Sequence, residues 1–70
     1  MTKMVEVVSS NIKAIGFDEL KNELTVEFLS GGKYVYGAVP ESIYETFLEA
    51  ESKGKFFHRN IRNVYSYSKV

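Results

Sequence analysis

Hydrophobic and polar residues follow two different periods along the chain, and the change occurs near Pro40. Leu24, Val26 and Phe28 alternate with polar residues, which is the spacing of a half-buried β-strand. After Pro40, apolar residues recur at three- and four-residue intervals, as on one face of an α-helix: Ile43, Tyr44, Phe47, Leu48 and Ala50. The pattern therefore predicts strands in the first half of the chain and helices in the second.

The strand region is expected to form an antiparallel meander over about residues 5–39. Residues 4–8 and 12–17 are rich in Val, Ile and Phe, and they predict one bent strand or two short strands joined at the polar turn Ser9-Ser10-Asn11. After a further polar turn, the strand around Val26 and a strand over residues 33–39 form a hairpin. We count three strands in this meander.

The length of the hairpin loop decides which face Tyr34 and Tyr36 occupy. A two-residue Gly31-Gly32 loop would pair Glu27 with Tyr36 and leave both tyrosines on the polar face. A three-residue loop with a left-handed glycine would pair Phe28 with Tyr34 and Val26 with Tyr36. We favour the second, because so small a core needs its aromatic rings. One face would then carry Leu24, Val26, Phe28, Tyr34, Tyr36 and Ala38, and the other Lys13, Ile15, Thr25, Glu27 and Val35.

Two helices are expected after the meander. The first spans residues 40–51, with Pro40 in its first turn. Gly54 is expected to end this helix or to form the bend before a second helix over residues 55–62, which packs Phe57 inward. The tail over residues 64–68 is a short strand or an ordered coil. The predicted fold class is α+β, a three-stranded β-meander followed by two helices packed on one face (β-β-β-α-α), in a single domain over residues 1–70.

The charges divide unevenly along a chain whose net charge is zero. Residues 1–52 contain all nine carboxylates, whereas residues 53–70 contain Lys53, Lys55, Arg59, Arg62 and Lys69 and no acid. Such asymmetry can mark a binding surface for nucleic acid or for an acidic protein. A helical stripe of Glu41, Glu45 and Glu49 could instead lie beside the basic residues and neutralise them.

Composition argues against several classes of protein. The chain has no cysteine and one histidine, so neither a disulfide framework nor a Cys/His zinc site is expected, and we expect no metal and no cofactor. His58 reads as a surface or capping residue. No apolar run approaches about 20 residues and the first residues lack a signal-peptide pattern, so we expect no membrane partner and a cytoplasmic location.

Catalytic motifs are also missing from the sequence. There is no Gly-x-Ser-x-Gly elbow, no phosphate-binding loop and no dinucleotide fingerprint, and Gly31-Gly32-Lys33 lies in a hairpin rather than before a helix. Glu45 and Glu49 form a carboxylate pair with nothing nearby to shift their acidity. We therefore expect a protein that is not an enzyme and has no catalytic residues.

A series of short motifs extends in order over about residues 5–67. They are Ser9-Ser10-Asn11-Ile12, Ile15-Gly16-Phe17-Asp18, Leu24-x-Val26-x-Phe28, Gly31, Tyr34-x-Tyr36, Val39-Pro40, Tyr44, Ala50-x-Ser52-x-Gly54-x-Phe56-Phe57 and Ile61-Arg62. This series resembles the KTSC domain, a family named for its occurrence at the C-terminus of some lysyl-tRNA synthetases and also found as small bacterial and phage proteins. The resemblance implies a domain of unestablished function, for which RNA binding has been suggested, and it brings no catalytic residues. His58 stands where the family would more often carry Asn.

The candidate nucleic-acid-binding residues are basic or aromatic and lie near the C-terminus: Lys53, Lys55, Arg59, Arg62, Tyr65 and Tyr67. The basic side chains could neutralise phosphates while a tyrosine stacks on a base. An ordinary solvated helix face is the alternative. The motif residues that we expect to be mainly structural are Ser9, Ser10, Asn11, Tyr34, Tyr36, Pro40 and Gly54, although Tyr34 and Tyr36 could also stack on bases.

Two functions follow from these residues. The first is an accessory module that binds RNA, with tRNA as one candidate partner, through the basic second helix and the tail. The alternative is a protein-interaction module of bacterial or phage origin that uses Phe56, Tyr65 or Tyr67 as anchors. The sequence leaves the oligomeric state open.

Overall fold

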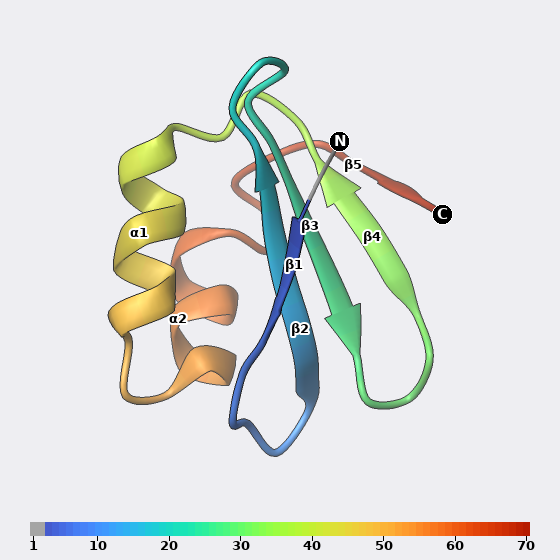
Figure 1. Ribbon diagram of the computed structural model, residues 1–70, viewed down its shortest axis with the longest axis vertical. Coiled ribbons are helices and arrows are strands. Elements are labelled where there is room, and N and C mark those ends of the chain that lie inside the picture. The colour runs from blue at the N-terminus through green and yellow to red at the C-terminus, as the bar shows by residue number, and fades with distance from the viewer. Residues whose placement is uncertain (1–2) are drawn as a thin grey trace.

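The computed structural model describes residues 3–70. Along the chain, these residues form the elements β1 (Lys3–Glu6), β2 (Ile12–Asp18), β3 (Glu23–Phe28), β4 (Lys33–Tyr36), α1 (Glu41–Glu49), α2 (Lys53–Asn60) and β5 (Tyr67–Lys69). Figure 1 shows both helices on the same side of the sheet. Neither helix in the described part of the chain has the length and apolar character needed to cross a membrane. The expected α+β class, with helices on one face of an antiparallel sheet, is confirmed.

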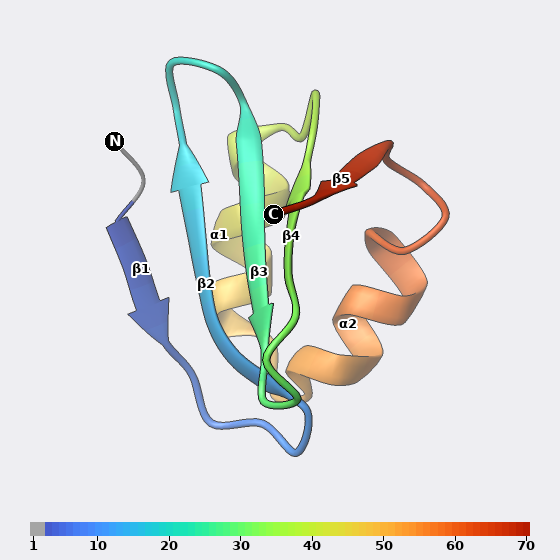
Figure 2. The same ribbon diagram turned by 90° about the vertical axis from the view of Figure 1, so that its right-hand side faces the viewer.

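The sheet contains five strands in the order β1-β2-β3-β4-β5, so the expectation of three strands was wrong. The two apolar segments near the N-terminus are separate strands that pair with each other, from Lys3 opposite Phe17 to Glu6 opposite Ala14. The tail forms the fifth strand. It returns after α2 and pairs antiparallel with β4, as Figure 2 shows along the edge of the sheet.

The β3–β4 hairpin has the expected kind of loop but a different register. The Phe28 N–H donates to the Gly32 carbonyl at 2.8 Å, which closes a three-residue loop in which Gly31 has a φ of 104°. Val26 therefore faces Tyr34, and Leu24 faces Tyr36, two residues away from the expected pairs. An even shift preserves the face of each side chain, so Tyr34 and Tyr36 do lie on the helix side.

Two residues lie on a different face or element from the one expected. A bulge between Ile12 and Ala14 shifts the register of β2, so that Ile15 lies opposite Val26 and is fully buried on the helix side rather than on the outer face. Ala38 is exposed, lies beyond the end of β4 and has a φ of 56°, so it does not extend the strand face. The strand expected over residues 33–39 ends at Tyr36.

The helices differ from their expected bounds of 40–51 and 55–62. Pro40 is extended, with a ψ of 144°, and precedes α1 rather than forming its first turn. Ser52 caps α2, because its hydroxyl accepts a hydrogen bond from the Lys55 backbone N–H at 3.3 Å. Gly54 consequently lies within the first turn of α2, and neither ends α1 nor forms the bend between the helices.

The core fills the space between the sheet and the helices. Phe47 of α1 and Phe57 of α2 are buried against residues from β2 and β3, among them Ile12 and Leu24. The buried hydrophobic residues are Ile12, Ala14, Ile15, Leu24, Val26, Tyr36, Val39, Phe47, Phe57 and Ile61. This packing fixes α2 beside β4 and β5, where the candidate site lies.

Candidate nucleic-acid interface

Five aromatic rings from four elements meet between α2 and the last strands of the sheet. We call Phe28, Tyr34, Tyr36, Phe57 and Tyr67 the aromatic cluster. The Phe57 ring centroid lies 5.4 Å from that of Phe28 and 5.6 Å from that of Tyr36, in edge-to-face contacts. The Tyr67 ring lies 5.5 Å from both Tyr34 and Tyr36. These separations are within the range at which aromatic pairs stabilise one another.

The strand register brings the tyrosines together. Tyr34 and Tyr36 are two residues apart in β4, so both point to the helix side. Tyr67 lies directly opposite Tyr36 in the β4–β5 pair and points the same way. Tyr36 is 4% exposed whereas Tyr67 is 61% exposed, so the cluster extends from the core to the surface.

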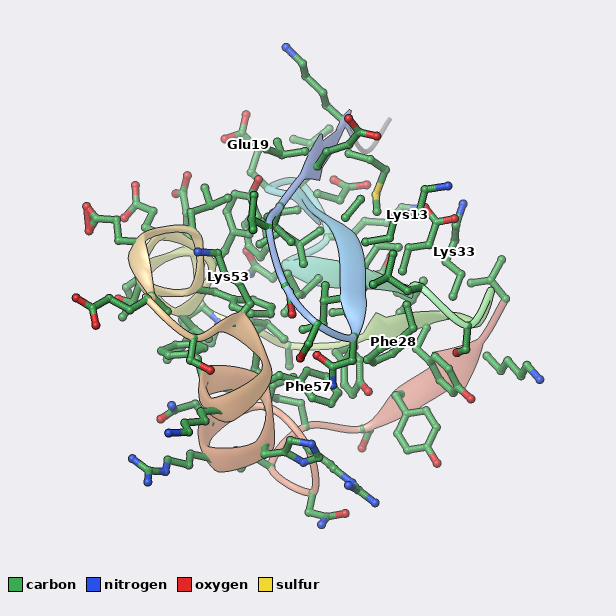
Figure 3. All side chains as sticks on the ribbon, turned by 90° about the horizontal axis from the view of Figure 1, so that it is seen from below. Lys13, Glu19, Phe28, Lys33, Lys53 and Phe57 are labelled. Carbon is green, nitrogen blue, oxygen red and sulfur yellow. The ribbon has the colours of Figure 1, made fainter. Side chains whose placement is uncertain are left out.

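The aromatic cluster lines a pocket of about 400 Å³. The other lining residues are mainly polar and come from loops and from the end of α2: Asn11, Ser30, Gly32, His58, Arg62 and Asn63. Figure 3 shows Phe28 and Phe57 directed toward each other between the sheet and α2. The pocket therefore combines an aromatic wall with one guanidinium, one imidazole and two amides.

The Arg62 charge and the neighbouring tyrosines influence the acidity of the Tyr36 hydroxyl. Burial raises the pKa of Tyr36 above 10.0, neighbouring Tyr67 and Tyr34 raise it further, and the positive charge of Arg62 opposes these effects. No buried side-chain oxygen or nitrogen within residues 3–70 lacks a hydrogen-bond partner. Because no side-chain hydrogen bond involves the Tyr36 hydroxyl, this group reaches the open space of the pocket.

The Arg62 side chain contacts His58, which lies in the last turn of α2. Its Nη1 atom lies 3.2 Å from Nδ1 of His58. An arginine can only donate, so Nδ1 accepts, and this geometry requires a neutral imidazole with its proton on Nε2. His58 was expected to be a surface or capping residue; it is exposed, but it also lines the pocket and orients Arg62 there.

The structure brings one of the predicted basic residues to the pocket and places the others elsewhere. Arg62 lines the pocket, whereas Lys55 and Arg59 lie on the exposed surface of α2 outside it, and Lys69 lies in β5 opposite Tyr34. Lys53 points to the other end of α2, where its Nζ donates to the Ala50 carbonyl after α1 (Figure 3).

The two predicted stacking residues also differ. Tyr67 is exposed at the pocket, whereas Tyr65 is half-buried, packs against the core and does not line the pocket. Of these two tyrosines, only Tyr67 has an exposed ring that lines the same pocket as Arg62.

The acidic stripe of α1 forms no hydrogen bonds with the basic residues. Glu41, Glu45 and Glu49 are exposed. Among the side-chain hydrogen bonds of residues 3–70, none joins a lysine or arginine to a carboxylate. The alternative in which this stripe clasps the basic groups therefore has no such contact to support it.

The turn between β1 and β2 is tied together by its own side chains. The Ser9 hydroxyl donates to Asn11 Oδ1 at 3.1 Å and accepts from the backbone N–H groups of Asn11 and Ile12 at 3.3 Å. This is the structural role that the sequence predicts for a polar turn. Ser10 is exposed and takes no part in these bonds, whereas Asn11 also lines the pocket.

Several pocket residues were not singled out as binding residues by the sequence. Phe28 was assigned to the core, Gly32 was rejected as part of a phosphate-binding loop, and Ser30 and Asn63 were not considered as binding residues. Asn63 has a φ of 65°, a left-handed conformation that asparagine adopts more readily than most residues, and this turn aims the chain from Arg62 toward β5. The Arg62-Asn63 pair after a helix is the one local signal that could have indicated a turn here.

Within residues 3–70, no cluster of three His, Cys, Asp or Glu side chains could hold a metal ion.

Comparison with known proteins gives consistent matches. A protein-family model described as the KTSC domain matches residues 8–65. The chain is similar to the crystal structure of a KTSC domain protein from Yersinia pestis, with a TM-score of 0.98 and 34% identity, over 100% of this chain and 99% of that chain.

Two further matches come from curated relatives. An uncharacterized protein of Stutzerimonas stutzeri is 40% identical over 57 residues, which are 81% of this chain and 80% of that protein. A lysine–tRNA ligase of Nostoc sp. is 38% identical over 61 residues, which are 87% of this chain but only 11% of the ligase. The match to the ligase is thus limited to one small part of a much longer protein.

Proposed function

Since this chain belongs to the KTSC domain family, found also within some lysyl-tRNA synthetases, we propose that it binds RNA, with tRNA as one candidate, through the pocket and the adjoining surface of α2. The observation that carries the proposal is the position of Arg62 on the rim of an aromatic pocket. RNA-binding proteins commonly combine these two features, because rings stack on bases and arginine binds phosphate.

The exposed surface of α2 extends the positive charge beyond the pocket. Lys55 and Arg59 are exposed on α2, and Arg62 follows two residues after the helix ends at Asn60. No acidic residue occurs after Glu51, so this face has no carboxylate of its own. An RNA strand whose base enters the pocket would pass its phosphates along these cations.

Relatives support RNA as the ligand. The name of the lysine–tRNA ligase states that this enzyme acts on tRNA. A segment of 61 residues in the ligase aligns with this chain. An accessory domain with an aromatic and cationic surface could supply extra tRNA contacts there. We extend that role to this chain as part of the proposal.

The alternative of a protein-interaction module has weaker support. Phe56 stacks on Phe47 with ring centroids 5.2 Å apart, and Tyr65 packs on the core, so two of its three proposed anchors are occupied. The two most exposed apolar residues, Val8 at 96% and Leu20 at 90%, lie in turns at opposite ends of the sheet (Figure 1), so these two share no patch.

The test is an anisotropy titration with labelled tRNA and with a labelled single-stranded RNA at about 50 mM salt. Arg62→Gln and Lys21→Gln each remove one positive charge; the first lies at the pocket, and the second lies in the β2–β3 turn at the far end of the sheet (Figure 1). We expect Arg62→Gln to weaken binding about tenfold, as the loss of a charged hydrogen bond would, and Lys21→Gln to change it by less than about twofold. The proposal fails if the protein does not bind RNA at this salt, or if both variants lose the same affinity.

A further inference from the structure

We infer that the pocket takes one unpaired nucleotide, with its base against the Tyr67 ring and its phosphate against the Arg62 guanidinium. This inference rests on the proposed function and makes it more specific. The RNA that the protein recognises would be a single strand, a loop or an end, and not a continuous duplex.

The size of the pocket limits what can enter. At about 400 Å³ it lies near the lower end of the range of about 300–1,000 Å³ for sites that bind small molecules. One nucleotide fits such a volume. A base inside a duplex is stacked on both faces and cannot enter unless it leaves the stack.

Only part of the aromatic cluster is free to stack. Phe57 and Tyr36 are each 4% exposed and meet each other at an interplanar angle of 78°. Phe28 is half-buried and meets both Tyr34 and Phe57 edge to face. Tyr67 is the open ring of the cluster, since it is 61% exposed and its contacts are with Tyr34 and Tyr36. A base would therefore stack on Tyr67, with the other rings forming the wall behind it.

Charge and hydrogen-bonding groups surround this ring. Arg62 is already oriented by its 3.2 Å bond to His58, so little side-chain freedom is lost when it binds a phosphate. Asn11 and Asn63 line the same pocket and offer amide donors and acceptors to the edge of a base. A planar base joined to an anionic phosphate matches all three kinds of group, whereas an aliphatic peptide side chain would leave the amides and the guanidinium unpaired.

The three residues proposed to contact the nucleotide come from distant parts of the chain. Arg62 follows α2, Tyr67 begins β5 and Asn11 precedes β2, and they meet because the tail returns to the sheet beside β4. The site is therefore built by the fold and is absent from an isolated α2 peptide.

The experiment uses the whole chain and nucleoside monophosphates as probes, with ribose 5-phosphate and inorganic phosphate as base-free controls. Binding is followed by NMR and by tyrosine emission, because the chain contains five tyrosines and no tryptophan. We expect the monophosphates to shift the signals of Tyr67, Arg62 and Asn63 and to bind about tenfold or more tightly than ribose 5-phosphate. Equal affinity for ribose 5-phosphate would show an anion site alone and overturn the inference.

Two variants at one exposed position separate stacking from folding. Tyr67→Ala removes the ring and is expected to weaken monophosphate and single-stranded RNA binding about tenfold, whereas Tyr67→Phe keeps the ring and is expected to retain binding within about threefold. If Tyr67→Ala binds single-stranded RNA as tightly as the unchanged protein, or a duplex binds as tightly as a single strand, the inference is wrong while the RNA-binding proposal stands. Pocket shifts with monophosphates but no binding of any RNA would overturn the proposed function and support the nucleotide site alone.

Discussion

The Asn11 side-chain oxygen lies 3.0 Å from the position that a Cβ atom on Gly54 would occupy. The first turn of α2 thus passes directly over the turn between β1 and β2, and a methyl group on Gly54 would fit only if the Asn11 amide moved by a few tenths of an ångström. Asn11 is also held by Ser9 and lines the pocket. This contact explains why a glycine stands inside a helix, where it ordinarily lowers stability.

The effect of replacing Gly54 on the free energy of unfolding is expected to depend on Asn11. Gly→Ala inside a helix normally stabilises by about 0.5–1 kcal/mol. In this chain, the new methyl group would push against the Asn11 amide and disturb its bond with Ser9, so Gly54→Ala should not produce that gain. In an Asn11→Ala background the gain should appear. Urea unfolding of the four proteins in this cycle measures the coupling, and an equal gain in both backgrounds would contradict the contact.

Phe57 is expected to dominate the stability of the interface between α2 and the sheet. Its ring is 4% exposed and meets both Phe28 and Tyr36. Phe57→Ala should lower the free energy of unfolding by about 3–5 kcal/mol, a large part of the total for a small domain. Thermal or urea unfolding tests this. Leu20→Ala, at a position that is 90% exposed, is the control and should change stability by less than about 0.5 kcal/mol.

The salt dependence of RNA binding should show whether Arg59 and Arg62 contact phosphates. For single strands, the slope of log affinity against log salt is about −0.7 per phosphate neutralised. Arg59→Gln and Arg62→Gln should therefore each reduce the slope by about 0.7, because both residues lie on the proposed phosphate path. Titrations at four or more salt concentrations give the slopes. Glu49→Gln on α1 is the control. We expect this variant to keep the slope of the unchanged protein, whereas both arginine variants reduce it. If the slope is the same for all of these proteins, the proposed phosphate path is wrong.

Stability should fall in the alkaline range because two tyrosines hold their protons more tightly in the folded state. Burial raises the pKa of Tyr36 and of Tyr44 above the ordinary 10.0, and Tyr36 is raised further by Tyr67 and Tyr34. Above pH 10.0 the unfolded chain therefore binds fewer protons than the folded chain, and the free energy of unfolding decreases as pH rises through the folded pKa values. Below pH 10.0 this contribution is fully present.

Phenolate absorbance measured during an alkaline titration checks this expectation. The folded protein should ionise later than the protein in denaturant, and Tyr36→Phe should remove part of the delay. Coincident titration curves for the folded and denatured protein would show that the two phenols are not protected.

Local sequence patterns were sufficient for the type of each main element. Alternation at Leu24, Val26 and Phe28 identified β3, and the three- and four-residue spacing around Phe47 identified α1. The face of Tyr34 and Tyr36 was also predictable, although their partners were not, because a shift of two residues in the register leaves every side chain on its original face. Helix ends were less predictable, since the Ser52 cap rather than Gly54 sets the start of α2.

By itself, then, the sequence determined the α+β class, the core face of the central hairpin and the concentration of positive charge near the C-terminus. Only the tertiary structure decided the number of strands, because β1–β2 and β4–β5 pairing depends on backbone hydrogen bonds whose partners no local period specifies. It also decided the site. Asn11 and Arg62 are fifty-one positions apart, and they line one pocket because α2 packs over the β1–β2 turn while β5 returns to the sheet edge.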